Sequence, residues 1–216
     1  MKLLVIFDLD GTLWDSRSQI VPIWNRVFSR YPEIKIRITE QDCLGYMGRT
    51  IWDIAEEILP HHTEEQRRII MKECSIEETE YLRIHGAVLY PHLLETLKEL
   101  QHVGYDLHIV SNCQDGYIEA FMEAHDMNEY FTDYECPGRT GLSKAKNIQL
   151  ILERNPWSKA VYIGDTLGDY NAATEAGLPF IHAKYGFGSV PDAKFKLNSL
   201  LELPLLLSTV FANSGK

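Results

Sequence analysis

Four short runs rich in Val, Ile, Leu and aromatic residues recur along the chain, and each ends in small or polar residues. They occupy residues 3–7, 107–110, 160–163 and 180–183. Runs of this length and composition are typical of strands buried on both faces. Segments of helical periodicity separate them, and this alternation is characteristic of a parallel sheet with helices on both sides. The sequence therefore predicts an α/β fold.

Apolar residues at spacings of three and four mark the helices expected between these strands. Their stripes are Leu93, Leu94, Leu97 and Leu100, then Ile118, Phe121 and Met122, then Ile148, Ile151 and Leu152. Gly104 and Gly177 follow helical runs at positions where glycine supplies a left-handed turn. Residues 193–197 are expected to add an edge strand, and Ser199 is expected to cap a last helix.

Residues from about 16 to 85 differ, because their periodicity is helical throughout and includes no buried-strand run. Thr63 and Gln66 form a predicted capping box at the start of the third helix of this segment. The segment could be an outer layer of the same domain or a lid over the end of the first strand. Its size and position favour the lid, since long connections without function are uncommon.

Composition limits the function further. The 216 residues carry a formal net charge of -10 and lack a dense run of Lys and Arg, so nucleic acid is not an expected partner. The four cysteines are dispersed and form no C-x-x-C pair, which indicates a reducing compartment. Neither a signal segment nor a membrane-spanning run is recognisable. We therefore expect a soluble, cytoplasmic protein of at most two domains that is not bound to a membrane.

Two carboxylates, Asp8 and Asp10, stand where the first strand ends, within Asp8-Leu9-Asp10-Gly11-Thr12. Ligand crevices in open parallel sheets lie outside the carboxyl ends of the strands. Two carboxylates at one site repel each other unless a proton or a hard divalent cation lies between them. An ordinary Asp-Gly turn after a strand explains the motif equally well.

Further polar residues follow the other strands and favour the functional interpretation. Ser111 and Asn112 follow the second strand, and Gly164-Asp165 with Asp169 follow the third. Lys144 lies at the start of the helix over residues 145–153, with Lys146 as a competing candidate. Each alone is explained by a helix cap or a solvated lysine. Together these residues lie where strands or helices end, at the edge where a parallel sheet places its crevice.

These residues resemble the four ordered motifs of the haloacid dehalogenase superfamily, and the similarity extends from residue 2 to about residue 188. The resemblance is to the phosphoglycolate-phosphatase-like members. It implies a Rossmann-like, three-layer catalytic core over residues 1–15 and 86–216, a helical C1-type cap over residues 16–85, and a Mg²⁺ cofactor.

The resemblance also implies roles for individual residues. Asp8 corresponds to the nucleophile and Asp10 to the general acid and base. Mg²⁺ would be held by Asp8, the main-chain carbonyl of Asp10 and Asp165, with Asp169 more remote or acting through water. The catalytic set includes Lys144. The substrate-binding set is Thr12, which orients its loop, Ser111 and Asn112 on the phosphoryl oxygens, and Arg49, which corresponds to a cap contact with the far end of the substrate.

The sequence thus predicts a Mg²⁺-dependent phosphatase that hydrolyses a small organic phosphate monoester, a small phosphorylated metabolite, through an aspartyl-phosphate. One alternative is a sugar phosphomutase of the beta-phosphoglucomutase type, which shares the core groups. A non-catalytic binding module is a further alternative. The sequence indicates no oligomeric state. The glycine-rich stretch Tyr185-Gly186-Phe187-Gly188 is interpreted as a strand-to-loop turn.

Overall fold

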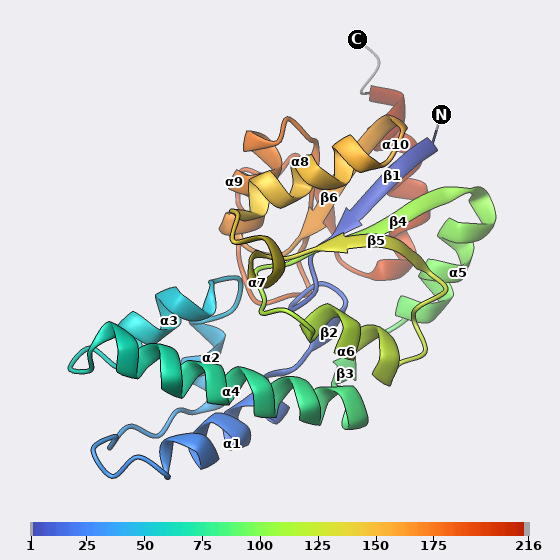
Figure 1. Cartoon of the computed structure of the whole chain (residues 1–216). Coiled ribbons are helices and arrows are strands. Elements are labelled where there is room, and N and C mark those ends of the chain that lie inside the picture. The colour runs from blue at the N-terminus through green and yellow to red at the C-terminus, as the bar shows by residue number, and fades with distance from the viewer. Residues whose placement is uncertain (1, 214–216) are drawn as a thin grey trace.

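The computed structural model describes residues 2–213 and contains a six-stranded, fully parallel sheet with the strand order β5-β4-β1-β6-β7-β8 (Figure 1). The strands are β1 (Lys2–Phe7), β4 (Tyr105–Val110), β5 (Phe131–Glu135), β6 (Trp157–Gly164), β7 (Phe180–Ala183) and β8 (Phe195–Leu197). The predicted α/β class and the parallel sheet are confirmed.

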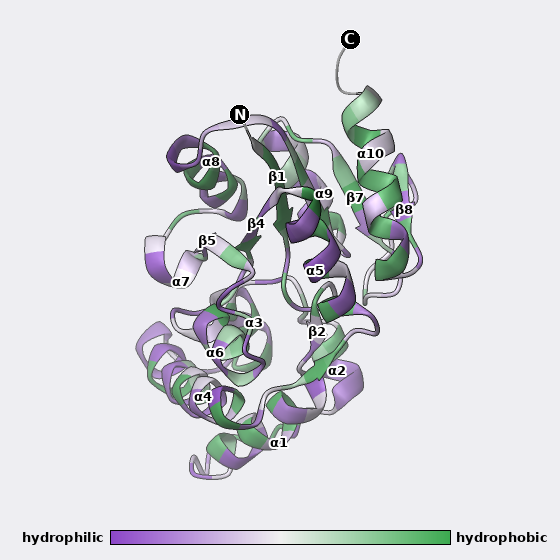
Figure 2. Cartoon of the chain, turned by 90° about the vertical axis from the view of Figure 1, so that its right-hand side faces the viewer, coloured by the Kyte–Doolittle hydropathy of each residue, from purple (hydrophilic) through white to green (hydrophobic). Residues whose placement is uncertain are grey.

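Helices cover both faces of the sheet, as the alternation of side chains along β1 shows. Val5 and Phe7 pack in the apolar cluster of α5 (Leu93–Val103), α6 (Tyr117–Ala124) and α10 (Leu203–Asn213). Leu4 and Ile6 pack in the cluster of α8 (Lys144–Arg154) and α9 (Leu167–Glu175). Successive side chains of a strand point to opposite faces, so a continuous apolar run serves both layers. Figure 2 shows these hydrophobic strands between the helices.

Residues 16–85, which we call the helical insert, form α1 (Arg17–Phe28), α2 (Glu40–Leu44), α3 (Ile51–Ile58) and α4 (Glu64–His85). Its apolar side chains, including Trp24, Phe28 and Met71, form a cluster separate from the two sheet clusters. The predicted capping box is present, since the Thr63 hydroxyl accepts the Gln66 N–H and the Gln66 side chain accepts the Thr63 N–H.

A short antiparallel pair, β2 (Trp14–Asp15) and β3 (Val88–Leu89), joins the two ends of the insert to the sheet. The head of β1 points toward the insert in Figure 1. The insert therefore lies beyond the carboxyl ends of the strands, at the edge where the polar motifs were expected.

The structure differs from the sequence-based expectation mainly at the edges of the sheet. Strand β5 was not predicted, because its sequence Phe-Thr-Asp-Tyr-Glu alternates with polar residues as edge strands often do. The expected edge strand near the end of the chain is β8. Ser199 caps the short 3-10 helix η1 (Leu200–Glu202), which α10 follows. A further short helix, α7 (Pro137–Thr140), lies between β5 and α8.

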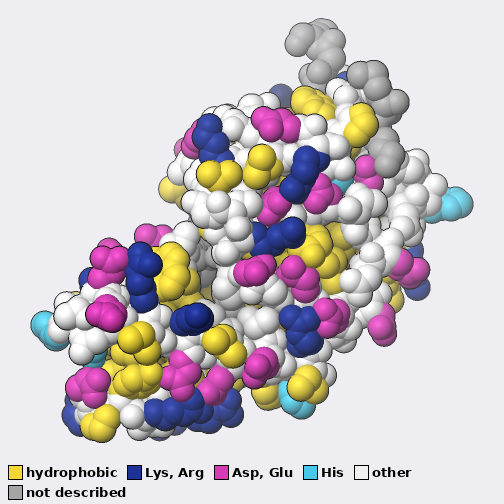
Figure 3. Space-filling view, in the orientation of Figure 1, with side chains coloured by type: hydrophobic (Ala, Val, Ile, Leu, Met, Phe, Trp, Pro, Cys, Tyr) yellow, Lys and Arg dark blue, Asp and Glu magenta, His cyan; other side chains and the backbone are white. Residues whose placement is uncertain are grey.

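Charged side chains of both signs are interspersed on the face of the molecule seen in Figure 3. On the helical insert, Arg26 pairs with Glu77, and Arg30 pairs with both Glu73 and Glu77. Within residues 2–213, no helix has the length and apolar character needed to cross a bilayer.

Candidate active site

Strands β1, β4 and β6 end side by side, and their register places the first polar residues after each strand together. The Asp8 N–H donates to the carbonyl of Ile163 in β6 at 2.8 Å, and the Ser111 N–H donates to the carbonyl of Glu135 in β5 at 3.3 Å. These ladder contacts fix the backbone just where each strand stops. Asp8, Ser111 and Asp165 therefore emerge at one edge of the sheet from segments far apart in the sequence.

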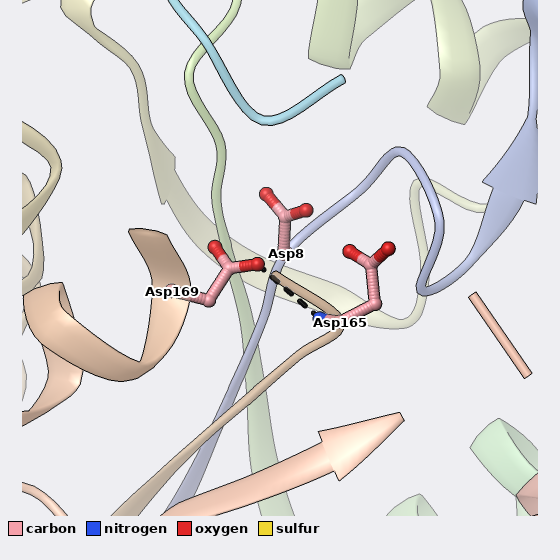
Figure 4. Close-up of side chains that lie close together, drawn as sticks. All are labelled: Asp8, Asp165 and Asp169. Atoms are coloured by element: carbon pink, nitrogen blue, oxygen red, sulfur yellow. Dashed lines mark hydrogen bonds between the residues drawn. The ribbon is translucent and has the colours of Figure 1, made fainter. Parts of the chain in front are cut away.

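Three buried carboxylates form the centre of this edge. Asp8, Asp165 and Asp169 each offer an oxygen within 4.8 Å of the others, and Figure 4 shows the three side chains pointing to the same side. Burial, together with the charge of Asp169, raises the pKa of Asp8 to about 7. Burial and the charges of Asp169 and Asp8 also raise the pKa of Asp165 well above its ordinary value. Asp8 and Asp165 therefore need positive charge beside them to be ionised near neutral pH.

The donor set fits a hard divalent cation. All three side chains offer carboxylate oxygens, the ligands that such ions prefer. One of them, Oδ1 of Asp165, is buried without a hydrogen-bond partner, and buried polar atoms of this kind are rare unless something else satisfies them. The triad could therefore hold a metal ion.

Lys144 supplies the positive charge among these carboxylates. Its Nζ donates to Oδ1 of Asp8 at 2.8 Å and to Oδ1 of Asp169 at 2.6 Å, and the side chain is buried. Burial opposes the charged form, but the charges of Asp169 and Asp8 raise the pKa of Lys144 well above its ordinary value. The Ser143 hydroxyl caps α8, so Lys144 is its first residue and points into the site. Lys146, the competing candidate, is exposed.

Asp169 also shapes the loop that carries Asp165. Its Oδ2 accepts the N–H groups of Asp165 at 3.2 Å and Thr166 at 2.9 Å, and the Thr166 hydroxyl at 2.7 Å. Together with the bond to Lys144, these contacts occupy both oxygens of Asp169. Its observed contacts thus position the loop and the ammonium group.

Asp10 lies in a different environment from Asp8, with two partners that the sequence motifs did not reveal. Its Oδ1 accepts the Ser16 hydroxyl at 2.6 Å and lies 3.0 Å from the Tyr117 hydroxyl. Burial raises the pKa of Asp10 to about 6, against the opposing effect of hydrogen bonds from Ser16 and Tyr117. A carboxyl group with this pKa can both give and take a proton near neutral pH.

The glycine-rich stretch after β7 contributes more than the predicted turn. The N–H groups of Phe187 and Gly188 donate to Oδ2 of Asp165 at 2.6 and 3.2 Å. A Cβ on Gly186 would lie 2.3 Å from the carbonyl oxygen of Gly11 and 2.4 Å from Cβ of Asp165. The loop therefore packs directly against two of the motifs and orients one carboxylate of the triad. The signal in the sequence was the pair of glycines, which indicates a close approach of backbones.

Gly186→Ala is expected to displace this loop, because the added methyl group meets a backbone atom that cannot rotate away. We expect the free energy of unfolding to fall by about 1–3 kcal/mol and metal-dependent turnover to fall by at least about 10²-fold, since small misplacements in a site have effects of that size. Denaturant titration and turnover assays measure the two effects. Gly168→Ala in α9 is the control, since its nearest neighbour is 3.4 Å away. Equal behaviour of the two variants would contradict the packing argument.

A cavity of about 60 Å³ lies between the sheet edge and the helical insert. From the core it is lined by Asp8, Asp10, Ser111, Asn112, Cys113, Gln114 and Tyr117, and from the insert by residues that include Trp24, Tyr46, Arg49 and Glu78. Asn112 Nδ2 donates to the carbonyl of Gly48 at 2.8 Å and so connects the two walls.

Two of the predicted substrate-binding residues have other contacts. The guanidinium of Arg49 lines the cavity, but it donates to Oε2 of Glu57 at 2.5 Å and to the carbonyl of Asp53 at 3.0 Å. Thr12 is fully buried and is not among the residues that line the cavity, and its carbonyl accepts the Tyr185 hydroxyl at 2.9 Å. Asp8, Asp10, Ser111 and Asn112 share the cavity wall.

Comparison with known proteins agrees with this geometry. The model of the haloacid dehalogenase-like hydrolase family matches residues 5–183. A phosphoglycolate phosphatase of Vibrio parahaemolyticus is 26% identical, with 93% of each chain covered. A haloacid dehalogenase-like hydrolase of Streptococcus pneumoniae superimposes with a TM-score of 0.79 at 20% identity, covering 96% of this chain and 98% of that one.

CbbY from Rhodobacter sphaeroides, solved in complex with xylulose-(1,5)bisphosphate, superimposes with a TM-score of 0.78 at 20% identity, covering 94% of this chain and 96% of that one. The family predicted from the sequence is confirmed, as is the enzyme class, a phosphoric monoester hydrolase. The family model covers most of the chain. The matched residues include the ends of β1, β4 and β6 and the start of α8, where Lys144 lies. This chain therefore belongs to the haloacid dehalogenase-like hydrolases and resembles the phosphoglycolate phosphatases among them.

Proposed function

We propose that the protein is a Mg²⁺-dependent phosphatase that hydrolyses a small organic phosphate monoester through an aspartyl-phosphate on Asp8. The observation that carries this proposal is the pairing of two unlike carboxyl groups at one cavity. Asp8 is bonded to the Lys144 ammonium, whereas Asp10 is bonded to hydroxyl groups. A divalent cation at the carboxylate triad would stabilise the ionised form of Asp8, whereas Asp10 lies outside the triad and can keep its proton, and this would separate a nucleophile from a proton donor.

In the first step, an oxygen of Asp8 attacks the phosphorus atom while the bond to the leaving alkoxide breaks in line with it. Asp10 gives its proton to the leaving oxygen, so the alcohol departs neutral. Ser16 and Tyr117 hold the Asp10 carboxyl in place for this transfer. In the second step, Asp10 takes a proton from water as the water oxygen attacks phosphorus and the bond to Asp8 breaks, which releases inorganic phosphate.

Asp8, Asp165 and the main-chain carbonyl of Asp10 would hold Mg²⁺, with Asp169 acting on the loop or through water. When bound there, Mg²⁺ supplies positive charge to the phosphoryl oxygens as negative charge develops on them. The remaining charge compensation comes from the chain itself. Ser111, Asn112 and Lys144 are proposed to donate to the transferred oxygens, and Thr12 is proposed to fix its loop through the bond to Tyr185.

We further propose that residues 16–85 act as a cap over a core formed by residues 1–15 and 86–216. The support is the separate apolar cluster of the insert and its place beyond the strand ends. Arg49 lines the same cavity, but its bonds to Glu57 and to the carbonyl of Asp53 oppose the contact with the far end of the substrate that the sequence predicts. The four free cysteines support a reducing compartment, and we propose the cytoplasm.

A sugar phosphomutase is the second candidate, and it is favoured by the similarity of the fold to a protein solved with a sugar bisphosphate. The curated relatives are phosphatases, and they favour the first candidate. Because these relatives are named for phosphoglycolate, that ester belongs in the panel that tests the proposal.

The decisive experiment measures phosphate release from a panel of phosphorylated metabolites, with Mg²⁺ and with Mg²⁺ removed by EDTA. We expect inorganic phosphate to accumulate only with the metal present. Analysis of the organic product separates the candidates, because a mutase yields an isomerised sugar phosphate instead of phosphate and alcohol. A protein that turns over no phosphate ester under either condition would refute both enzymatic candidates.

A further inference from the structure

Glu78 is a buried carboxylate of α4 that lines the cavity from the side of the helical insert. Its Oε2 accepts the indole N–H of Trp24 at 2.5 Å, and its Oε1 accepts the amide of Gln114 at 3.1 Å. None of the ion pairs found within residues 2–213 includes Glu78. A buried acidic group without a cation is unusual unless it meets a ligand.

The hydrogen-bonding capacity of Glu78 is only partly used. A carboxylate offers about four acceptor sites on its two oxygens, and two donors are bound to it. Burial, together with the charge of Asp10, raises the pKa of Glu78 to about 7, although Trp24 and Gln114 oppose the shift. A donor or a positive charge placed in the cavity would stabilise the ionised form.

The other charges around the cavity make it an unfavourable place for an anionic leaving group. Its acidic lining residues are Asp8, Asp10 and Glu78, and Arg49 is the only Lys or Arg among the residues that line it. The guanidinium of Arg49 is already paired with Glu57. Lys144 and the proposed metal site serve the phosphoryl end, so the far end of a substrate meets Glu78 without a compensating cation.

We infer that Glu78 selects the leaving group, favouring a small alcohol that carries a hydrogen-bond donor, either a hydroxyl or a protonated amine, and disfavouring one that carries a carboxylate. This inference rests on the proposed phosphatase function and specifies its substrate class. Asp8 lies at the end of β1, whereas Glu78 lies on α4 of the insert. The phosphoryl group and the selected group therefore face opposite walls of the cavity.

Three phosphate monoesters of equal length test the inference, because they differ only in the terminal group of a two-carbon alcohol. They are 2-hydroxyethyl phosphate, phosphoethanolamine and phosphoglycolate. With Mg²⁺ present, we expect kcat/KM for the hydroxyl and ammonium esters to exceed that for the carboxylate ester by at least about 10²-fold, since a site built to bind donors rejects groups that leave its acceptors unpaired. A carboxylate ester that is turned over as fast as the other two would overturn the inference.

The Glu78→Gln variant tests whether this residue sets the preference. It keeps the size of the side chain and one acceptor oxygen, but it removes the charge. We expect the ratio of kcat/KM between the ammonium and carboxylate esters to fall by at least about 10-fold. Glu65→Gln is the matched control, since Glu65 is exposed on the same helix, and this variant should keep the wild-type ratio. An unchanged ratio in Glu78→Gln would refute the role of Glu78.

The two levels of the proposal fail in different ways. Phosphate release from all three esters without the expected ranking refutes the selection by Glu78 and leaves the phosphatase standing. Absence of Mg²⁺-dependent release from every ester refutes the phosphatase and the selection with it. If Glu78→Gln does not fold, the ranking of the three esters by the wild-type protein still decides.

Discussion

Replacing Asp8 with asparagine is expected to lower kcat for phosphate release by at least about 10⁴-fold, the scale seen when an enzyme loses its nucleophile. The neutral amide cannot attack phosphorus, and it withdraws one charged oxygen from the carboxylate triad. Release of phosphate from any substrate of the wild-type protein measures the effect. Asp10 cannot replace Asp8 as the nucleophile in the proposed arrangement, since its carboxyl group is bound to Ser16 and Tyr117.

The Asp8→Asn variant requires evidence that the fold is intact. Its melting temperature should lie near that of the wild type without metal, because Lys144 keeps its bond to Asp169. Asp192→Asn, an exposed position away from the cavity, is the control with the same chemical change. Full activity in Asp8→Asn would show that the mechanism proposed above is wrong.

Replacing Lys144 with methionine is expected to affect stability and turnover together. The change leaves Asp8 and Asp169 buried without the ammonium that bridges them. Removing one partner of a buried ion pair destabilises proteins by about 3–5 kcal/mol, and losing a charged donor to a developing phosphoryl charge lowers kcat by about 10²–10³-fold. Urea titration and phosphate release measure the two effects. Added Mg²⁺ should restore part of the stability, because it returns positive charge to the triad.

Lys146→Met provides the matched control for this prediction. Lys146 lies two residues further along α8, where its side chain is exposed. Surface substitutions of this kind usually change the free energy of unfolding by less than about 0.5 kcal/mol. If Lys146→Met lost as much activity and stability as Lys144→Met, the assignment of the site lysine would be refuted.

Local patterns in the sequence were sufficient for the central part of the fold. The runs that became β1, β4, β6 and β7 are continuous and apolar because both faces of each strand are covered, and this signal lies within a few residues. Strand β5 lies at the edge of the sheet, where one side is not paired, so its composition is mixed. An edge strand gives a weaker local signal than a central one for this physical reason.

The candidate site was predictable where it depends on strand ends and unpredictable where it depends on long-range packing. The positions of Asp8, Ser111 and Asp165 follow from the parallel sheet. By contrast, Tyr117 reaches Asp10 across 107 positions of sequence, and Gln114 reaches Glu78 across 36. The first contact joins α6 to the loop after β1, and the second accompanies the packing of α4 against α6. No spacing within a motif encodes either of them.

The central place of β1 has a consequence for how the protein forms in the cell. This strand pairs with β4 and β6, and about 150 residues separate its end at Phe7 from the start of β6 at Trp157. A ribosome that adds ~5–20 residues per second needs roughly 8–30 s to make that stretch. During this interval β1 lacks one of its two neighbours, whereas α1 and α4 of the insert can already pack together. The sheet of a nascent chain therefore stays incomplete at its centre until β6 emerges, and the Asp8 site cannot form before Asp165 and Asp169 have been made.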